Sequence, residues 1–466
     1  MPPPRHDGPG TACTMIHSTP PHRRLRLPLR QRGQAMIFGI FVLLGAAVAT
    51  FYLFNTGQMT AEKTKLVNTA DAVAYSAGVM HARALNFDAY TNRALVANEA
   101  TIAQMVSISS WLEYSEEHVE RVPPMMCYPG SYTPIPVWLG TLRYAPLCYI
   151  LSSGAGGAVV EVADGIFNSE GVGGGAATVF LAELAKTELK LMQATVAAGM
   201  VFARDSVMRE VANVNYHDNG NVSVDTVPLK DNWISFDGGS FISKRTDNER
   251  TRMKDVILDV VGRDRFVTTR SWTDDSQWPC LIAPIGEARR TGGTQLNGFD
   301  SWEARDDASY RVRQMRWRGL SFRCRTTATY ALGSGHLKTS STPGTAWYYS
   351  GVPNFYELSD AALGYSIESG GPRLQFSIRL TRANGETRTS GNASGIKPTG
   401  RLERFDSAAA SGVLAAVATS EVYFDHRQED ETEELGSLFN PYWQVHLISN
   451  PAAVTAAALA LQGATP

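Results

Sequence analysis

The stretch RQRGQAMIFGIFVLLGAAVATFYLF, from Arg30 to Phe54, contains an uncharged run that begins at Ala35. At about 1.5 Å of rise per residue, a helix of that run crosses a ~30 Å hydrocarbon layer. A secretory signal has a shorter apolar core, of about 7–15 residues, followed by small residues at a cleavage site. This run instead ends in Tyr52 and Phe54, which suit a membrane–water interface. We therefore expect a retained transmembrane helix over residues 34–56.

Basic residues precede this run and set the expected topology. They are Arg23, Arg24, Arg26, Arg30 and Arg32. Because positive flanks stay in the cytoplasm, the rest of the chain should be exported. The sequence predicts a single-pass protein of a bacterial inner membrane, with a disordered basic cytoplasmic tail over 1–33 and a periplasmic bulk.

Charge limits the classes of partner. The chain has 466 residues, with 43 Lys and Arg against 45 Asp and Glu, and a net charge of -2. No polyanionic partner is implied by that balance. We expect no nucleic acid and no small-molecule substrate as partners, whereas the lipid bilayer is one.

The cysteines are divided by the apolar run. Cys13 precedes it, and Cys127, Cys148, Cys280 and Cys324 follow it. An even number in an oxidising compartment favours two disulfides, although four buried free thiols remain an alternative. Pairing within each region needs no contact between regions, so we expect Cys127–Cys148 and Cys280–Cys324.

A long amphipathic helix is expected after the membrane span, up to about Arg121. Its apolar residues recur at spacings of three, four or seven. They are Leu66, Ala70, Val73, Ala77, Met80, Ala84 and Phe87. Several of these are alanines, so a partner helix could approach closely. Charged residues, including Lys63 and Arg83, are interpreted as lying off this stripe.

A second helix is expected from about Ala176 to Val214, folding back antiparallel along the first. Its expected inward stripe is Phe180, Leu184, Met192 and Val196, widened by Leu181, Leu189 and Met200. The hairpin would occupy 57–215, with a Cys- and Gly-rich excursion at 123–175 that includes a short helix near 158–167.

Residues 216–449 change to a period of two, typical of strands. Apolar and polar residues alternate from Leu374 to Leu380, and Asn384–Gly385 could form a tight hairpin turn. Strands are also expected at 221–227, 266–270 and 320–325, a helix near 408–419, and a tail over 450–466. The fold class is α+β: a transmembrane helix continuing into an exported helical hairpin, followed by a β-rich domain.

Signals for catalysis are scarce. The glycines at 171–175 match a dinucleotide fingerprint by letter, but no strand precedes them, which favours a joint between helices. His217 with Asp218 could bind a metal, although a solvated turn is the simpler interpretation. Arginines interleaved with aromatics at 310–325 could bind single-stranded nucleic acid; the solvated face of two strands is favoured. We expect no cofactor, no metal site and no enzyme activity.

Two segments resemble the TadE/TadG-like proteins of tight-adherence (Flp) pilus assembly. The first reads Arg32-Gly33-Gln34-Ala35, then the apolar span, then NTADAVA from Asn68 to Ala74. The second, from Glu421 to Leu447, contains the core LFNPYW and resembles the closing segment of longer members. Together the two segments cover about 75 residues and leave the middle of the chain without a resemblance.

Departures from the family pattern limit which family properties the resemblance implies for this chain. Gly33 and Gln34 mark a possible processing site, but Phe38 occupies the position where a pilin cut after Gly33 would have Glu. The D-x-S-x-S metal motif of some TadG-like proteins is absent from the sequence. Neither polymerisation as a major pilin nor metal-dependent adhesion is therefore implied.

The resemblance implies a non-enzymatic, minor pseudopilin-like or accessory component, acting as a membrane-anchored scaffold. Its partners would be other pilus-assembly or envelope proteins, met through helix packing. Two alternatives remain open. A periplasmic sensor or ligand-binding protein would have a concave pocket in residues 216–400, and an envelope hydrolase of unfamiliar fold would have clustered carboxylates or a His-activated nucleophile.

Overall fold

The computed structural model describes residues 32–122, 144–169, 173–217, 220–275, 280, 285–319, 321–365, 370–390, 412–425 and 434–462. The fold is mixed α+β. Four of the five basic residues expected to set the topology, Arg23 to Arg30, lie outside the described residues, as does Cys127. Arg32 begins the first helix.

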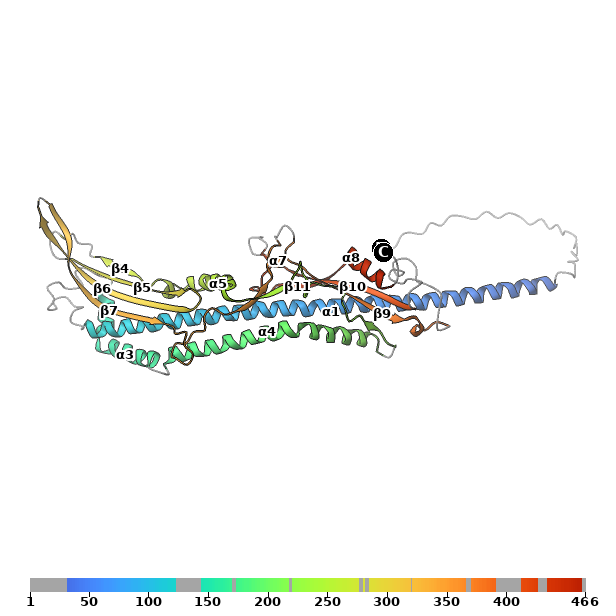
Figure 1. Ribbon diagram of the computed structural model, residues 1–466, viewed down its shortest axis with the longest axis horizontal. Coiled ribbons are helices and arrows are strands. Elements are labelled where there is room, and N and C mark those ends of the chain that lie inside the picture. The colour runs from blue at the N-terminus through green and yellow to red at the C-terminus, as the bar shows by residue number, and fades with distance from the viewer. Residues whose placement is uncertain are drawn as a thin grey trace, which may run out of the picture.

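One helix, α1 (Arg32–Arg121), runs the length of the molecule (Figure 1). Its 90 residues correspond to about 135 Å at 1.5 Å per residue. The apolar part projects beyond all other elements, and side chains from Met36 to Phe54 are exposed. From Met59 onward α1 enters the core. The membrane-type segment and the part of α1 inside the folded body therefore belong to one uninterrupted helix.

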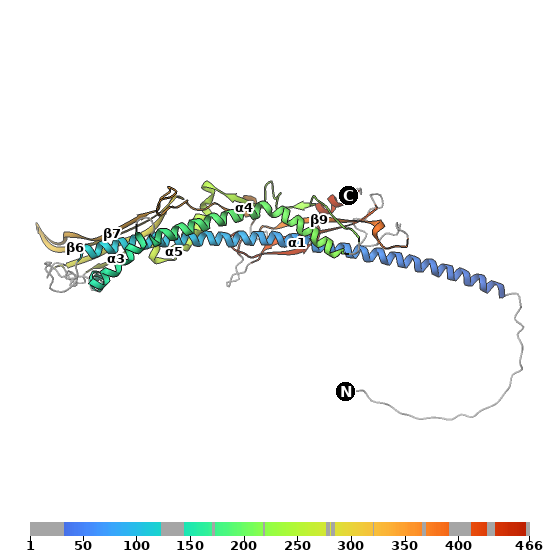
Figure 2. The same cartoon turned by 90° about the horizontal axis from the view of Figure 1, so that it is seen from below.

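Three helices follow α1: α2 (Tyr144–Ser152), α3 (Gly154–Asn168) and α4 (Gly174–Asn215). Helix α4 returns antiparallel along α1, as the views in Figures 1 and 2 both show. Ser153 caps α3, because its side chain accepts a hydrogen bond from the Gly156 amide. The expected hairpin is present, with α3 where a short helix was predicted.

The sheet nearest the membrane-type segment has the strand order β1–β9–β10–β11, with β2 also paired to β9. Its strands are β1 (Ser223–Val224), β2 (Lys230–Asp231), β9 (Leu374–Ala383), β10 (Val413–Phe424) and β11 (Trp443–Ile448). All of the pairs are antiparallel. In β9 Leu374, Phe376 and Ile378 are fully buried, as the alternation predicts, but Ser377 on the other face is fully buried as well.

A second sheet, in the order β4–β5–β6–β7, lies over the far end of α1 (Figure 1). It comprises β4 (Trp272–Asp275), β5 (Ile285–Asn297), β6 (Ser301–Arg318) and β7 (Ser321–Lys338). Between the two sheets, β3 (Ile242–Arg245) pairs with β8 (Phe355–Leu358). The shorter helices are η3 (Asp247–Arg250), α5 (Thr251–Gly262), α6 (Arg265–Thr268), α7 (Asp360–Leu363), η4 (Asn384–Glu386) and α8 (Ala452–Leu461).

Four local predictions were wrong. The alanine-rich segment expected as a helix near 408–419 is the buried strand β10 from Val413 onward. Residues 266–270 lie mostly in α6, and the expected tight turn at Asn384–Gly385 is the 3-10 helix η4. The expected tail over 450–466 contains α8, which packs through Val454 and Ala458 on the second face of β10.

Helix α1 contributes side chains to four hydrophobic clusters of the described residues, and each cluster also contains strand residues. Leu66 and Val73 pack with β9 and β10, whereas Ile102 and Val106 pack with Trp302 of β6. The expected division into a helical hairpin (57–215) and a β-rich domain (216–449) therefore does not correspond to separate cores. Both regions are built on α1.

Candidate assembly interface

The side of α4 that faces α1 and the strands combines apolar residues with four buried polar ones. Its buried residues include Glu183, Lys186, Gln193 and Arg204. The Gln193 side-chain amide donates to Thr91 Oγ1 at 2.8 Å and to Asn92 Oδ1 at 2.7 Å, both on α1. A buried polar group is tolerated when its hydrogen bonds are made, so this face depends on specific partners.

Lys186 is the centre of a buried ion cluster. Its ammonium lies 2.6 Å from Glu99 Oε1 of α1 and 2.6 Å from Glu183 Oε1. Tyr349 and Trp302 both donate to Glu99 Oε2, at 2.8 and 3.1 Å. Burial, and then the Glu99 carboxylate, raise the pKa of Tyr349 well above its usual value, so the phenol remains a donor. This cluster ties α4 and β6 to α1.

A second buried cluster joins the middle of α1 to α4. Arg204 lies 2.6 Å from Asp231 Oδ2, and its guanidinium is 3.0 Å from His81 Nε2. The His81 ring stacks on Trp233 at 5.3 Å. Burial, and then the Arg204 charge, lower the pKa of His81 well below 6.5, which keeps the imidazole neutral. Its neutral Nε2 then accepts the hydrogen bond that Arg204 donates.

The opposite side of α4 exposes several large apolar side chains. Its large exposed side chains are Phe180, Leu181, Leu184, Leu191, Met192 and Phe202. Phe202 is 81% exposed. The inward stripe expected from the sequence was therefore largely wrong: four of its seven members, Phe180, Leu181, Leu184 and Met192, face outward, and of the other three only Met200 is fully buried. The side of α4 that is buried depends on polar partners on α1 and the strands. The spacing of apolar residues along α4 could not reveal these partners.

The exposed residues form a nearly straight line along α4. Phe180, Leu191 and Phe202 recur every eleven residues, which is three helical turns plus about 20°. On α3, Val159, Val162 and Ile166 are also exposed, at helical spacing. Helices α3 and α4 lie on one side of α1, with the far sheet on the other (Figures 1 and 2). We call this combined surface the outer α3–α4 face.

Large exposed apolar surfaces are uncommon on monomeric proteins and usually mark an interaction site. The outer α3–α4 face is long, helical and approximately straight, so it matches the shape of another helix. It has the form of an assembly interface rather than of an active site.

The C-terminal LFNPYW segment binds α1 between Asn86 and Arg93, beyond the NTADAVA motif that ends at Ala74. Asn92 donates to the Leu438 carbonyl at 2.6 Å, and Arg93 donates to the Phe439 carbonyl at 2.6 Å. Asn86 exchanges two hydrogen bonds of 3.0 Å with the Trp443 backbone. At Gly78, an added Cβ would lie 2.5 Å from the Val445 side chain, so β11 approaches α1 closely there. The two segments that resemble the family are thus joined in space.

The predicted stripe on α1 faces the core. Leu66, Ala70, Val73 and Ala77 are fully buried, and Ala84 is buried as well. Met80 and Phe87 are half-buried. Their neighbours are α4 and the strands of this chain, not a partner protein.

Lys63 was wrongly placed off the stripe. It lies three residues before Leu66, in register with the buried positions, and is only 1% exposed. Its ammonium donates to the Ala415 carbonyl of β10.

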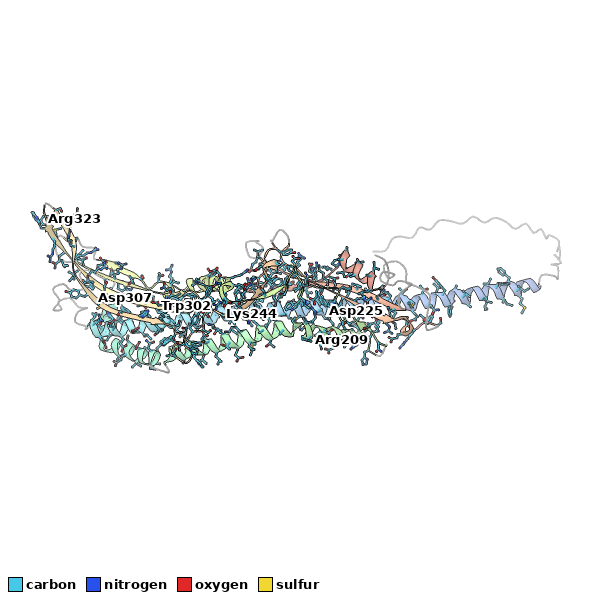
Figure 3. All side chains as sticks on the ribbon, in the orientation of Figure 1. Arg209, Asp225, Lys244, Trp302, Asp307 and Arg323 are labelled. Carbon is cyan, nitrogen blue, oxygen red and sulfur yellow. A yellow bond between two sulfur atoms is a disulfide. The ribbon has the colours of Figure 1, made fainter. Side chains whose placement is uncertain are left out.

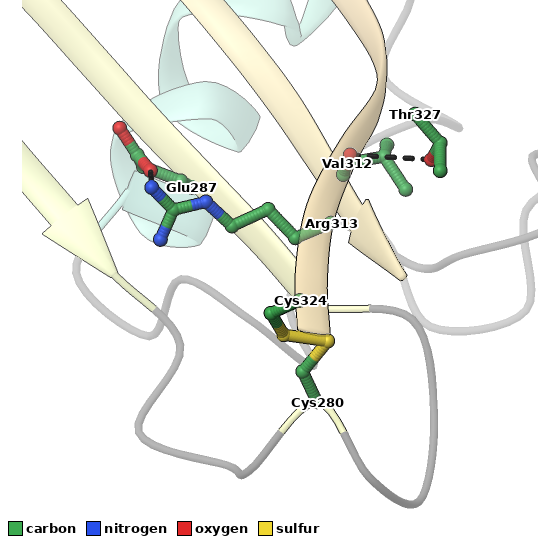
Figure 4. Close-up of a disulfide and its surroundings, with 6 residues drawn as sticks. All are labelled: Cys280, Glu287, Val312, Arg313, Cys324 and Thr327. Atoms are coloured by element: carbon green, nitrogen blue, oxygen red, sulfur yellow. Dashed lines mark hydrogen bonds and ion pairs between the residues drawn. A yellow bond between two sulfur atoms is a disulfide. The ribbon is translucent and has the colours of Figure 1, made fainter. Parts of the chain in front are cut away.

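A disulfide links Cys280 to Cys324 of β7 (Figure 4). Cys148, on α2, is also disulfide-bonded. In the same region Arg313 forms an ion pair with Glu287 at 2.9 Å. Glu287 lies 3.7 Å from Arg311 as well, so part of the arginine-rich segment is neutralised by the neighbouring strand.

A polar hollow lies on β5 and β6. It measures about 500 Å³ and is lined by Thr268, Thr291, Gly292, Gly293, Thr294, Gln295, Glu303, Arg305 and Asp307. Ligand pockets are usually enclosed by apolar and aromatic side chains, which this lining lacks. Within the described residues, no three His, Cys, Asp or Glu side chains are grouped so that they could hold a metal ion.

Comparison with protein families gives a match to the N-terminal part of the chain. Residues 33–84 match the family described as putative Flp pilus-assembly TadE/G-like. The N-terminal module is TadE/G-like. This module comprises the apolar part of α1, the NTADAVA motif and every member of the predicted α1 stripe except Phe87. The match supports a role in tight-adherence pilus assembly, and the apolar helix fits a single-pass membrane anchor. No curated protein and no solved structure matches the chain.

Proposed function

We propose that the protein is a non-enzymatic, membrane-anchored scaffold in tight-adherence pilus assembly, and that its outer α3–α4 face binds a helix of another assembly component. The observation that carries this proposal is the straight apolar line on α4, which is exposed although the same helix buries charged residues. The TadE/G-like module supplies the pilus context.

Two parts of the molecule would serve anchoring in the membrane and binding of a partner separately. The apolar part of α1 holds the protein in the membrane, and the ion clusters around Lys186 and Arg204 fix α4 on the body. Because these clusters hold α4 from its inner side, the large apolar side chains on its outer side remain available to a partner. Burying such a face against a second helix releases its apolar surface from water, worth about 25 cal/mol per Å².

Pilus formation by the source bacterium tests the proposal. Replacing Leu191 and Phe202 together by Ser should abolish pili while the protein remains in the membrane at its normal level. Val227→Ser is the matched control, because Val227 is 75% exposed but lies outside α3 and α4. Normal piliation with the double variant would refute the docking role, and normal piliation after deletion of the gene would refute the pilus role.

We also propose that the N-terminus is cytoplasmic and that the body lies in the periplasm, on the inner membrane. The arginines before the span support this orientation. Alkaline phosphatase fused to the C-terminus should be active in cells, since it needs export. Activity only for a fusion at the N-terminus would reverse the orientation.

A further inference from the structure

The hairpin of β6 and β7 continues beyond the rest of its sheet. The last pair between β5 and β6 is Ile285 with Arg313, whereas β6 and β7 remain paired as far as Arg318 with Ser321. Arg323 lies in this extension, at the end of the molecule farthest from the membrane-type helix (Figure 3). We call residues 314–319 and 321–327 the distal hairpin.

The distal hairpin exposes aromatic rings at its end. Trp317 and Phe322 are cross-strand partners, 66% and 59% exposed, and their rings meet edge to face at 4.8 Å. Large aromatic side chains at such exposure are unusual in water, and Trp in particular is enriched where proteins meet the membrane interface.

Exposed arginines surround these rings. Arg316, Arg323 and Arg325 are exposed. No acidic residue occurs between Gln314 and Thr327, and within the described residues Glu287 pairs only with Arg311 and Arg313, nearer the base. A basic residue close to an anionic lipid surface contributes about 1 kcal/mol of attraction.

The size of the distal hairpin narrows the choice of partner. Two strands are about 5 Å apart, so this tip offers far less than the ~800 Å² per partner of a standard protein interface. A nucleic acid strand needs a basic groove with aromatic platforms for successive bases, whereas these two rings pack against each other. A lipid headgroup layer needs only a few aromatic and basic side chains.

We propose that the distal hairpin binds the anionic headgroup surface of a second bilayer, facing the one that holds the apolar part of α1. The exported part of α1, from Asn55 to Arg121, measures about 100 Å at 1.5 Å per residue. The hairpin is carried at the far end of that helix, too distant to reach the anchoring bilayer. The disulfide at Cys324 braces its base.

Vesicle tethering tests this proposal on the full-length protein. The protein is reconstituted in phosphatidylcholine vesicles, and fluorescent target vesicles with or without 30% phosphatidylglycerol are added. Wild type should capture the anionic targets at least ten-fold more than the neutral ones, and capture should fall with added salt. Trp317→Ser with Phe322→Ser should remove capture, and Arg316→Gln with Arg323→Gln should remove its salt dependence.

Phe202→Ser on the outer α3–α4 face is the matched control and should leave capture unchanged. Retention of the Cys280–Cys324 bridge in each variant, checked by peptide mapping, shows that the hairpin is intact. Absence of capture by wild type, or equal capture by the aromatic variant, overturns the proposal. Binding of single-stranded DNA without capture of anionic vesicles overturns it in favour of a nucleic acid partner. None of these outcomes depends on pilus assembly.

Discussion

Lys186 and Lys63 hold their ammonium groups away from water, and each contacts a partner that is distant in sequence, Glu99 and the Ala415 carbonyl respectively. Lys186 neutralises Glu99 and Glu183, so its removal would leave two carboxylates buried without a countercharge. Lys186→Ala should therefore lower the free energy of unfolding by about 3–5 kcal/mol. Thermal unfolding of the full-length protein in detergent measures this effect.

Lys338→Ala is the control for that substitution, since Lys338 is exposed and should respond little. Changing Glu99, Glu183 and Lys186 together to Gln should recover much of the loss, because no buried charge then remains. A Lys186→Ala variant as stable as the control would show that the ion cluster does not hold α4.

The buried carboxyl of Asp88 should make the stability of the protein depend on pH. Its carboxyl is fully buried and has no hydrogen-bond partner among the described residues. Burial, and then the nearby Glu357, raise its pKa from 3.8 to about 8. A carboxyl whose pKa is higher in the folded state stabilises most below its unfolded pKa. Stability is lost as the pH rises from about 4 through 8.

Asp88→Asn should remove that dependence. The variant should match wild type near pH 4 and exceed it increasingly toward pH 8, by a few kcal/mol given about 1.4 kcal/mol per pKa unit. Asp259→Asn is the control, because Asp259 is 66% exposed and pairs only with Arg263. If Asp88→Asn raised the stability equally at every pH, the cause would be a packing effect and not the titration of Asp88.

At the scale of the elements, the packing of α1 leads to a prediction about protease resistance. Val73 is fully buried between α4 and the first sheet, whereas Tyr75 on the same helix is 44% exposed. Val73→Asp places an unpaired charge in the core and should make the folded body sensitive to protease. Tyr75→Asp should stay resistant; similar digestion of the two variants would contradict the packing of α1.

The sequence predicted which segments form the long helices but not which side of α4 is buried. The ends of α1 and α4 were close to those expected, because helix period and proline stops are local signals. The orientation of α4 depends instead on Glu99, Asp231 and Thr91, which lie some 25 to 105 residues away in the chain. The outer α3–α4 face was missed for this reason.

Strand β10 shows how packing overrides local preference. Alanines at 415, 416 and 418 favour a helix in isolation. In the fold this strand lies between β9 and β11, with Leu414 and Ala416 against α1 and α4 and Ala415 against α8. Because alanine side chains are small, helices can approach both faces of this strand. The same alanines that favour a helix in isolation therefore suit a buried strand in this fold.

At the scale of the whole molecule, the membrane anchor should remain attached. Prepilin processing after Gly33 would leave Phe38 where a pilin has Glu, so we expect inefficient cleavage. Intact-mass analysis of the membrane-extracted protein should show a chain that includes residues 33–54. A product beginning at Gln34 would reveal that the peptidase accepts Phe38, and a soluble product beginning after Phe54 would contradict the anchor.

The continuity of α1 has a mechanical consequence. Because no break separates the membrane-type segment from the body, the helix acts as a rigid lever whose pivot is the bilayer. A change in tilt of about 10° would move the end of a ~100 Å arm sideways by roughly 17 Å. Bilayer thickness sets the tilt of such a segment. Local thinning or thickening of the lipid would thus steer the opposite end of the protein without any change in its fold.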